Sequence, residues 1–179
     1  MLRFSVATIW LWLAGALAAL ADPAGFVDRL SADMATAAGQ SVQATEAVID
    51  GAFDIDAMAF AALPEWARDR ADRGYLTAYK TYFASRLVAE YRNSGEGGYR
   101  ILGTRENGAL TLVGTEVTSG ARRGVVEFYL RDEGESYRVV NLAIEGILVT
   151  AQQQKDFQPV LISGDIPGLT AFLIRGGAE

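Results

Sequence analysis

The chain has 179 residues, enough for one domain with a hydrophobic core, and half of them are apolar. Its 16 basic and 22 acidic residues give a net charge of −6, and such a surface repels nucleic acid and anionic headgroups. The sequence has no Cys, which excludes disulfides and thiolate catalysis, and no His, the commonest general base and metal ligand. We therefore expect no catalytic residue, no metal and no cofactor.

The first residues have the layout of a secretory signal peptide. Arg3 precedes an apolar run, Phe4–Leu17, and the small residues Ala19–Ala21 form an A-x-A cleavage site. A retained membrane anchor is the alternative, because about 18 apolar residues can just cross a bilayer. The small residues replace the flanking charges of such an anchor and favour cleavage. We expect residues 1–21 to be removed and residues 22–179 to form a single soluble domain.

Helical periodicity dominates the first half of the mature chain. Apolar residues recur at helical spacing from Phe26 to Ala38 and again over Ala44–Ile49. A further helix is predicted over Phe53–Leu63, with Asp54 as its N-cap, and Pro64 either ends it or starts the next. Glu65–Arg92 is predicted to be helical with a break near Gly74, and the cluster Asn93–Gly98 closes the helical half.

The second half has the pattern of an antiparallel meander. Asn107-Gly108 predicts a type I′ hairpin between Tyr99–Arg105 and Leu110–Val117. Two more turns are expected at Ser119–Arg123 and Arg131–Ser136. Tyr137–Ala151 is predicted to be one long strand bent by a bulge at Gly146, which would make the sheet concave and leave space against the helices. Gln152–Ile174 contains two short helical stretches divided at Ser163–Asp165.

These residues resemble the signatures of the MlaC family, the periplasmic phospholipid-binding (toluene-tolerance) proteins of the Mla lipid-asymmetry pathway. The strand Tyr137–Gly146 is similar to the family's aromatic-x-V-x-D-x-x-x-E-G pattern, although Asn141 stands where Asp is usual. The family's helical signatures are matched by Phe53-Asp54, Met58, Leu63, Trp66, Tyr79, Tyr82, Phe83, Leu87 and Tyr91, and later by Phe157, Leu161, Gly164 and Gly168–Leu173. Two further departures are Leu148, where Ser is common, and Pro64, where Gly is usual.

The resemblance implies an α+β fold of the cystatin/NTF2-like type. N-terminal helices would pack on a curved antiparallel sheet, with short C-terminal helices, and enclose an apolar pocket for phospholipid acyl chains. It also implies a shuttle, not an enzyme, that exchanges lipid with an inner-membrane ABC transporter carrying a lipid-binding ring and with an outer-membrane lipoprotein–porin complex. We expect a monomer that binds no nucleic acid.

Apolar side chains on the predicted helices and strands are the candidates for the pocket wall. Periodicity alone also fits ordinary core packing, and Trp66 and Phe157 are either plugs at the pocket mouth or packing residues. The candidates are Phe53, Met58, Trp66, Tyr79, Tyr82, Phe83, Leu87, Tyr91, Phe128, Val139, Ile144, Ile147, Val149, Phe157 and Leu161.

Charged residues leave two other classes of function open. Glu145, in the most apolar strand, is either a buried base of an NTF2-like isomerase or a carboxylate turned outward. Asp54 and Asp56 are two apart on a helix and do not share a face, so capping explains them better than paired catalysis. Arg122-Arg123 is predicted to be a solvated turn. A periplasmic chaperone that binds protein through an apolar groove is the remaining alternative.

The predicted cleavage gives a direct test. Protein isolated from a bacterial periplasm should have the intact mass of residues 22–179 and an N-terminus at Asp22. Protein of full-length mass, recovered only with membranes, would instead identify the first residues as an anchor.

Overall fold

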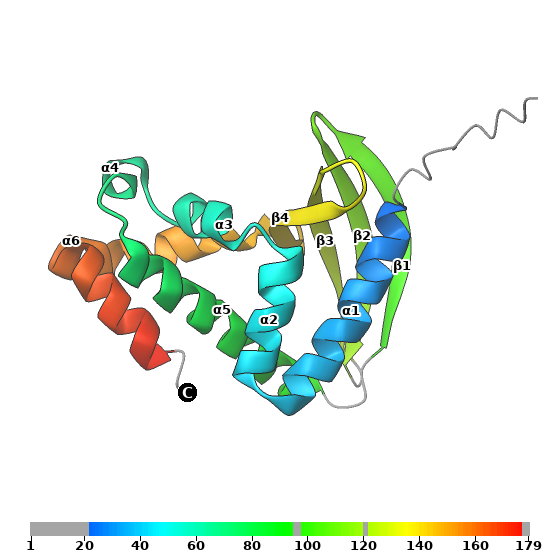
Figure 1. Ribbon diagram of the computed structural model, residues 1–179, viewed down its shortest axis with the longest axis horizontal. Helices are drawn as coiled ribbons and strands as arrows, with labels where there is room; N and C mark the ends of the chain where they lie inside the picture. Colours follow the sequence, from blue (N-terminus) through cyan, green and yellow to red (C-terminus); the bar gives the residue numbers. More distant parts are fainter. Residues whose placement is uncertain (1–21, 95–97, 120–121, 177–179) are drawn as a thin grey trace, which may run out of the picture.

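The structure is a computed structural model that describes residues 22–94, 98–119 and 122–176. The predicted signal peptide lies outside these residues. Five helices precede a meander of five strands, and a kinked helix follows (Figure 1). The helices are α1 (Pro23–Gln40), α2 (Val42–Ala52), α3 (Ile55–Ala61), α4 (Glu65–Arg68), α5 (Arg73–Ser94) and α6 (Val149–Gly176). The strands are β1 (Gly98–Asn107), β2 (Leu110–Ser119), β3 (Arg122–Asp132), β4 (Tyr137–Ile144) and β5 (Ile147–Leu148).

The first helices start at side chains that cap them. The Asp22 carboxylate accepts hydrogen bonds from the N–H groups of Ala24 and Gly25, and Pro23 follows at the first position of α1. Ser41 ends α1 and caps α2 by accepting from the Ala44 N–H. The predicted apolar stripe of α1 is buried, which confirms the helical periodicity.

The two predicted helix breaks are present. The chain leaves helical geometry between α4 and α5, just before Gly74. In α6 the break lies at Asp165, whose φ of 53° and ψ of −160° are not helical. This backbone region is one that residues other than glycine rarely adopt. By length and composition α6 could cross a membrane, but apolar core helices pass the same test, and α6 packs on α5 and β4.

The strands form one antiparallel sheet in the order β1-β2-β3-β4-β5. The predicted first hairpin is confirmed, but its turn is shifted by one residue. Asn107 pairs with Leu110, so the loop is Gly108-Ala109. Positive φ falls on Gly108 (64°) and not on Ala109, which is the type II′ pattern rather than the predicted type I′. The turn after β2 lies partly outside the described residues.

The prediction of one long strand over Tyr137–Ala151 is wrong. β4 ends at Ile144, and Glu145 and Gly146 turn the chain back with φ values of 51° and 78°. β5 follows, and α6 begins at Val149. Two consecutive positive φ values produce a tight hairpin where a single glycine suggested only a bulge.

A bulge does bend β4, at a different place from the one predicted. Leu130 pairs with Val139 and Tyr129 pairs with Asn141, which leaves Val140 as the extra residue. The sheet is curved, and α1 packs against β1 and β2 while α2, α3 and α6 contact β4 (Figure 1). The predicted α+β architecture, with helices on a curved antiparallel sheet, is confirmed.

A joint between the α2–α3 connection and β4 ties the helical half to the sheet. Phe53 forms a parallel bridge with Val139, and the Asp54 N–H donates to the Val139 carbonyl at 2.9 Å. Arg138 Nη1 donates to the carbonyls of Asp50 and Phe53, each at 3.0 Å. Arg131 Nη1 lies 2.8 Å from Asp54 Oδ2. We call these contacts the helix–sheet joint.

Asp54 also caps α3 by accepting from the Ala57 N–H at 3.0 Å, as predicted. Burial raises the pKa of its carboxyl group. Hydrogen bonds from Arg131 and Ala57, with the charges of Arg131 and Arg138, more than offset this effect and hold the pKa below 3.8. A lowered pKa in the folded state adds stability above the unfolded-state pKa, and this stability is lost as the pH falls through the folded-state pKa.

Two substitutions at Asp54 separate its charge from its cap. Asp54→Asn keeps an acceptor for the Ala57 N–H and should lower the free energy of unfolding at neutral pH by no more than about 1 kcal/mol, because the ion pair is partly exposed. That deficit should vanish as the pH falls through the folded-state pKa. Asp54→Ala should cost about 1 kcal/mol more at every pH, because the cap is also lost. Urea unfolding across pH checks this, and a deficit of Asp54→Asn that persists in acid would contradict it.

Candidate binding site

The core between helices and sheet contains many of the predicted pocket residues. The Phe83 ring centroid lies 5.7 Å from that of Phe53 and 6.3 Å from that of Tyr79. Tyr82 contacts Phe157 edge-on at 6.1 Å. The predicted residues that are fully buried are Phe53, Met58, Tyr79, Phe83, Val139, Phe157 and Leu161. Phe157 is 1% exposed and packs edge-on against Tyr82 and Phe172.

Two tyrosine hydroxyls inside this core donate to neutral acceptors. The Tyr75 hydroxyl donates to the Ala59 carbonyl and the Tyr79 hydroxyl to Gln153 Oε1, each at 2.7 Å. Burial raises the pKa of both tyrosines far above the ordinary value, so both hydroxyls remain protonated donors. Protonated hydroxyls with neutral partners suit apolar surroundings.

The remaining predicted residues lie at the margin of the core. Tyr82, Leu87, Phe128 and Val149 are half-buried, and Trp66, Tyr91, Ile144 and Ile147 are exposed. For an apolar side chain, exposure on the outside of a sheet needs no explanation. An exposed apolar side chain is therefore a candidate for the binding site only if it lies on the helix-facing side of the sheet.

The register of the sheet places several of them on its helix-facing side. Val113 is fully buried in the core, and Phe128 lies directly opposite it. Residues two apart on a strand share a face, so Val126 lies on the same side as Phe128. Ile144 is opposite Val126, and Ile147 is opposite Ile144. Directly opposite residues point to the same face. All four side chains therefore face the helices.

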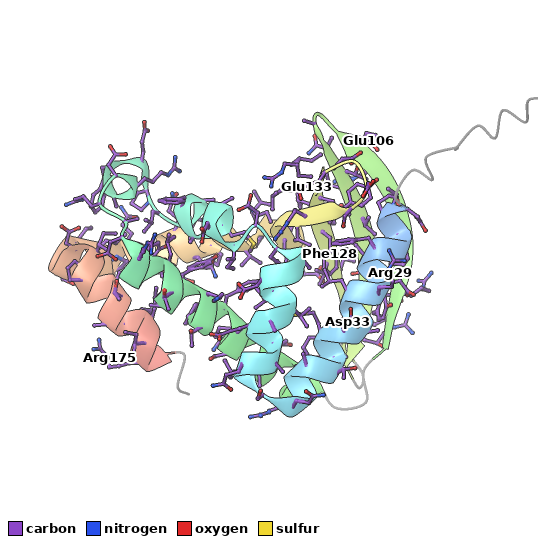
Figure 2. The ribbon with its side chains drawn as sticks, in the orientation of Figure 1. Arg29, Asp33, Glu106, Phe128, Glu133 and Arg175 are labelled. Atoms are coloured by element: carbon purple, nitrogen blue, oxygen red, sulfur yellow. The ribbon has the colours of Figure 1, made fainter. Side chains whose placement is uncertain are left out.

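These four residues, Val126, Phe128, Ile144 and Ile147, form what we call the apolar lip. Val126 and Phe128 are partly buried and pack against the core, and Figure 2 labels Phe128. Ile144 is 52% exposed and Ile147 is 55% exposed, although both face inward. The lip is thus the exposed margin of the helix-facing side of the sheet.

The last turns of α5 lead to the same end of the sheet. Leu87 and Tyr91 are one turn apart on α5 and share a face. β1 begins at Gly98, which pairs with Thr118 of β2, and Thr118 pairs with Arg123 at the start of β3. The start of β3 and the end of β4 are neighbours, so the chain returns from α5 to the end of the sheet that carries the lip.

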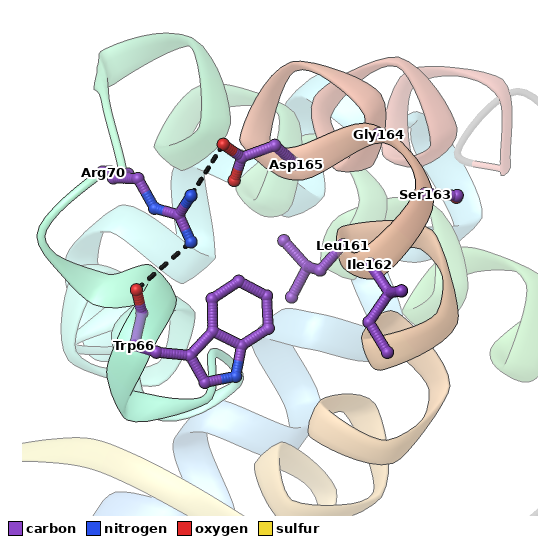
Figure 3. A pocket seen from close by; sticks show the side chains of 7 residues that line it. All are labelled: Trp66, Arg70, Leu161, Ile162, Ser163, Gly164 and Asp165. Atoms are coloured by element: carbon purple, nitrogen blue, oxygen red, sulfur yellow. Dashed lines mark hydrogen bonds and ion pairs between the residues drawn. The ribbon is translucent and has the colours of Figure 1, made fainter.

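Trp66 lies elsewhere, at an open pocket between α4 and the kink of α6 (Figure 3). The pocket has a volume of about 540 Å³ and includes Leu161, a buried core residue, in its wall. Arg70 donates to Asp165 Oδ2 at 2.8 Å and to the Trp66 carbonyl at 3.2 Å. Its guanidinium lies 5.1 Å from the centre of the Trp66 ring. Trp66, which is 50% exposed, therefore borders a pocket that the sheet residues do not reach.

The charged residues considered as catalytic candidates in the sequence lie at the start of a helix or bond to the backbone. Glu145 is exposed in the β4–β5 turn and accepts a hydrogen bond from the Val125 N–H at 2.7 Å, so it is not a buried base. Asp54 is a cap and Asp56 lies in the first turn of α3. Among the residues that the structure describes, no group of three or more acidic side chains converges in a way that could hold a metal ion.

Sequence reasoning missed two parts of this site. Val126 was not a candidate, although the alternation in VVEFYL already places it on the face of Phe128. The partners of Asp54, Arg131 and Arg138, gave no local signal because they are distant in the sequence.

The fold and the site define a small α+β protein in which helices pack on one face of a curved antiparallel sheet around an apolar core. Comparison with family models matches residues 25–174 to the MlaC protein model, and the chain belongs to the MlaC family. Among solved structures it is similar to a phospholipid-binding protein from Ralstonia solanacearum in complex with a phospholipid. The two are 15% identical with a TM-score of 0.72, over 88% of this chain and 98% of that one. No curated protein matches this chain.

Proposed function

We propose that this protein binds a phospholipid with its acyl chains between the helices and the sheet, and that the apolar lip is the entrance. The observation that carries the proposal is the exposure of Ile144 and Ile147 on the helix-facing side of the sheet. Membership of the MlaC family supports it, as does the fold shared with a protein solved in complex with a phospholipid.

The energetics explain why such a protein is needed. Removing about 30 methylenes of a diacyl lipid from water is worth on the order of 24 kcal/mol. A lipid therefore crosses an aqueous compartment only inside a protein whose interior is about as apolar as the bilayer. Loading and unloading are then nearly balanced, so partner proteins can set the direction of transfer.

We further propose that the protein is a periplasmic shuttle. It would be exported by residues 1–21 and act as a monomer. It would exchange phospholipid with the lipid-binding ring of an inner-membrane ABC transporter and with an outer-membrane lipoprotein–porin complex. The support is the family membership and the signal-peptide layout of the first residues. The two buried tyrosine hydroxyls, each bonded to a neutral acceptor, support binding without catalysis.

A matched pair of exposed isoleucine and leucine variants tests the lip. Ile144→Asp places a charge on the lip, where the side chain is already 52% exposed, so the fold should lose less than about 1 kcal/mol. Uptake of fluorescent phospholipid from vesicles should fall at least about tenfold, because the carboxylate would have to be desolvated against acyl chains. Val139→Asp is unsuitable, because Val139 is fully buried and its variant would unfold.

The control is Leu102→Asp on the opposite face of the sheet. Leu102 is 47% exposed, and its Cβ lies 3.8 Å from the position of a Cβ on Gly114, which points away from the core-facing Val113 and Thr115. Its uptake should equal that of the wild type. Equal uptake by both variants would place the entrance elsewhere, and no uptake by the wild type would contradict phospholipid binding.

A further inference from the structure

The side chain of Glu145 completes the hydrogen bonding between β3 and the β4–β5 hairpin. The regular ladder of these strands ends at the pair Val126 and Ile144. At the next position the Glu145 N–H still donates to the Val125 carbonyl at 2.9 Å. Glu145 has a φ of 51°, so the chain leaves the strand there and the ladder does not continue. The Val125 N–H instead donates to the Glu145 carboxylate, Oε1, at 2.7 Å.

The carboxylate thus takes the place of a backbone carbonyl and pins the hairpin to Val125 with a second bond. The short distance is typical of a hydrogen bond to a charged acceptor, which is stronger than one to a neutral acceptor. The backbone pairing of the hairpin is short, because β5 has only two residues and its pairing is limited to Ile144–Ile147 and Ala143–Leu148.

The absence of a side chain at Gly124 in β3 leaves space for the Glu145 carboxylate. A Cβ on Gly124 would lie 3.1 Å from Glu145 Oε1, tighter than nine in ten real Cβ contacts, so the carboxylate would have to shift. Gly124 follows the helix-facing alternation of Val126 in β3, so the carboxylate crosses the strand on the side that carries the apolar lip. Three independent features therefore agree on the position of the Glu145 carboxylate: its hydrogen bond to Val125, the absence of a side chain at Gly124 and the left-handed backbone at Glu145.

We infer that Glu145 is a positioning residue of the lipid entrance: its carboxylate, bonded to the Val125 N–H, fixes the hairpin that presents Ile144 and Ile147. The inference rests on the proposed function and names a residue that sets the geometry of its site. Glu145 acts as an acceptor in the right place and touches no acyl chain. Without the bond the two-residue hairpin frays, and the two isoleucines no longer hold a fixed surface for the arriving chains.

Two substitutions of Glu145 separate the acceptor from the charge. Glu145→Ala removes the acceptor, and the rate of phospholipid uptake from vesicles of phosphatidylethanolamine and phosphatidylglycerol should fall about fivefold, the equivalent of one hydrogen bond. Glu145→Gln keeps an oxygen acceptor and should restore the rate to within about twofold of the wild type. The midpoint of urea unfolding should be nearly the same in all three proteins, because Glu145 is exposed.

Gly124→Ala supplies an independent route to the same effect. The added methyl group should displace the carboxylate and slow uptake in the wild-type background. It should have little further effect in Glu145→Ala, where no carboxylate remains. Additive effects of the two substitutions would overturn the inference, as would wild-type uptake by Glu145→Ala or an equal defect in Glu145→Gln. If the wild type takes up no lipid, the proposed function itself fails. If the wild type is active and Glu145→Ala equals it, only this inference fails.

Discussion

The helix–sheet joint is the constraint on which the rest of the structure depends. Asp54 caps α3, receives the Arg131 guanidinium and donates its own N–H to Val139, so one residue fixes a helix end and a strand together. Arg138 donates to the carbonyls of Asp50, in the last turn of α2, and of Phe53, its C-cap. The two halves of the chain, one helical and one β, are thereby held at a defined separation.

That separation accounts for the character of the interior. Large aromatic and aliphatic side chains from both halves fill it, and the buried tyrosine hydroxyls bond to a carbonyl and an amide. At the apolar lip, the helix-facing side of the sheet is exposed to solvent. An apolar core whose wall reaches solvent at one end is the arrangement a lipid carrier requires, since acyl chains can replace side-chain contacts with contacts of the same kind.

Much of the fold was predictable because it depends on local signals. Asp54 as a cap and the breaks near Gly74 and at Asp165 follow from short-range chemistry. The single strand through Gly146 was wrong, because Glu145 adopts a left-handed conformation that its residue type does not suggest and that its bond to Val125 stabilises. For the site, composition and periodicity identify the apolar residues, but they do not show which face of the sheet each side chain occupies or how deeply it is buried. Val139 and Ile144 come from one apolar strand, yet one is fully buried and the other is mostly exposed, because the cover of helices decides burial.

The central claim is that the space between helices and sheet holds a phospholipid. The most direct test is solvent extraction and mass spectrometry of the protein purified from a bacterial periplasm without detergent. The account predicts near-equimolar phospholipid in the extract, and the extracted protein should take lipid up again from vesicles. Protein that carries no phospholipid and also fails to take it up would contradict the account, and would direct attention to a polar ligand or a protein client instead.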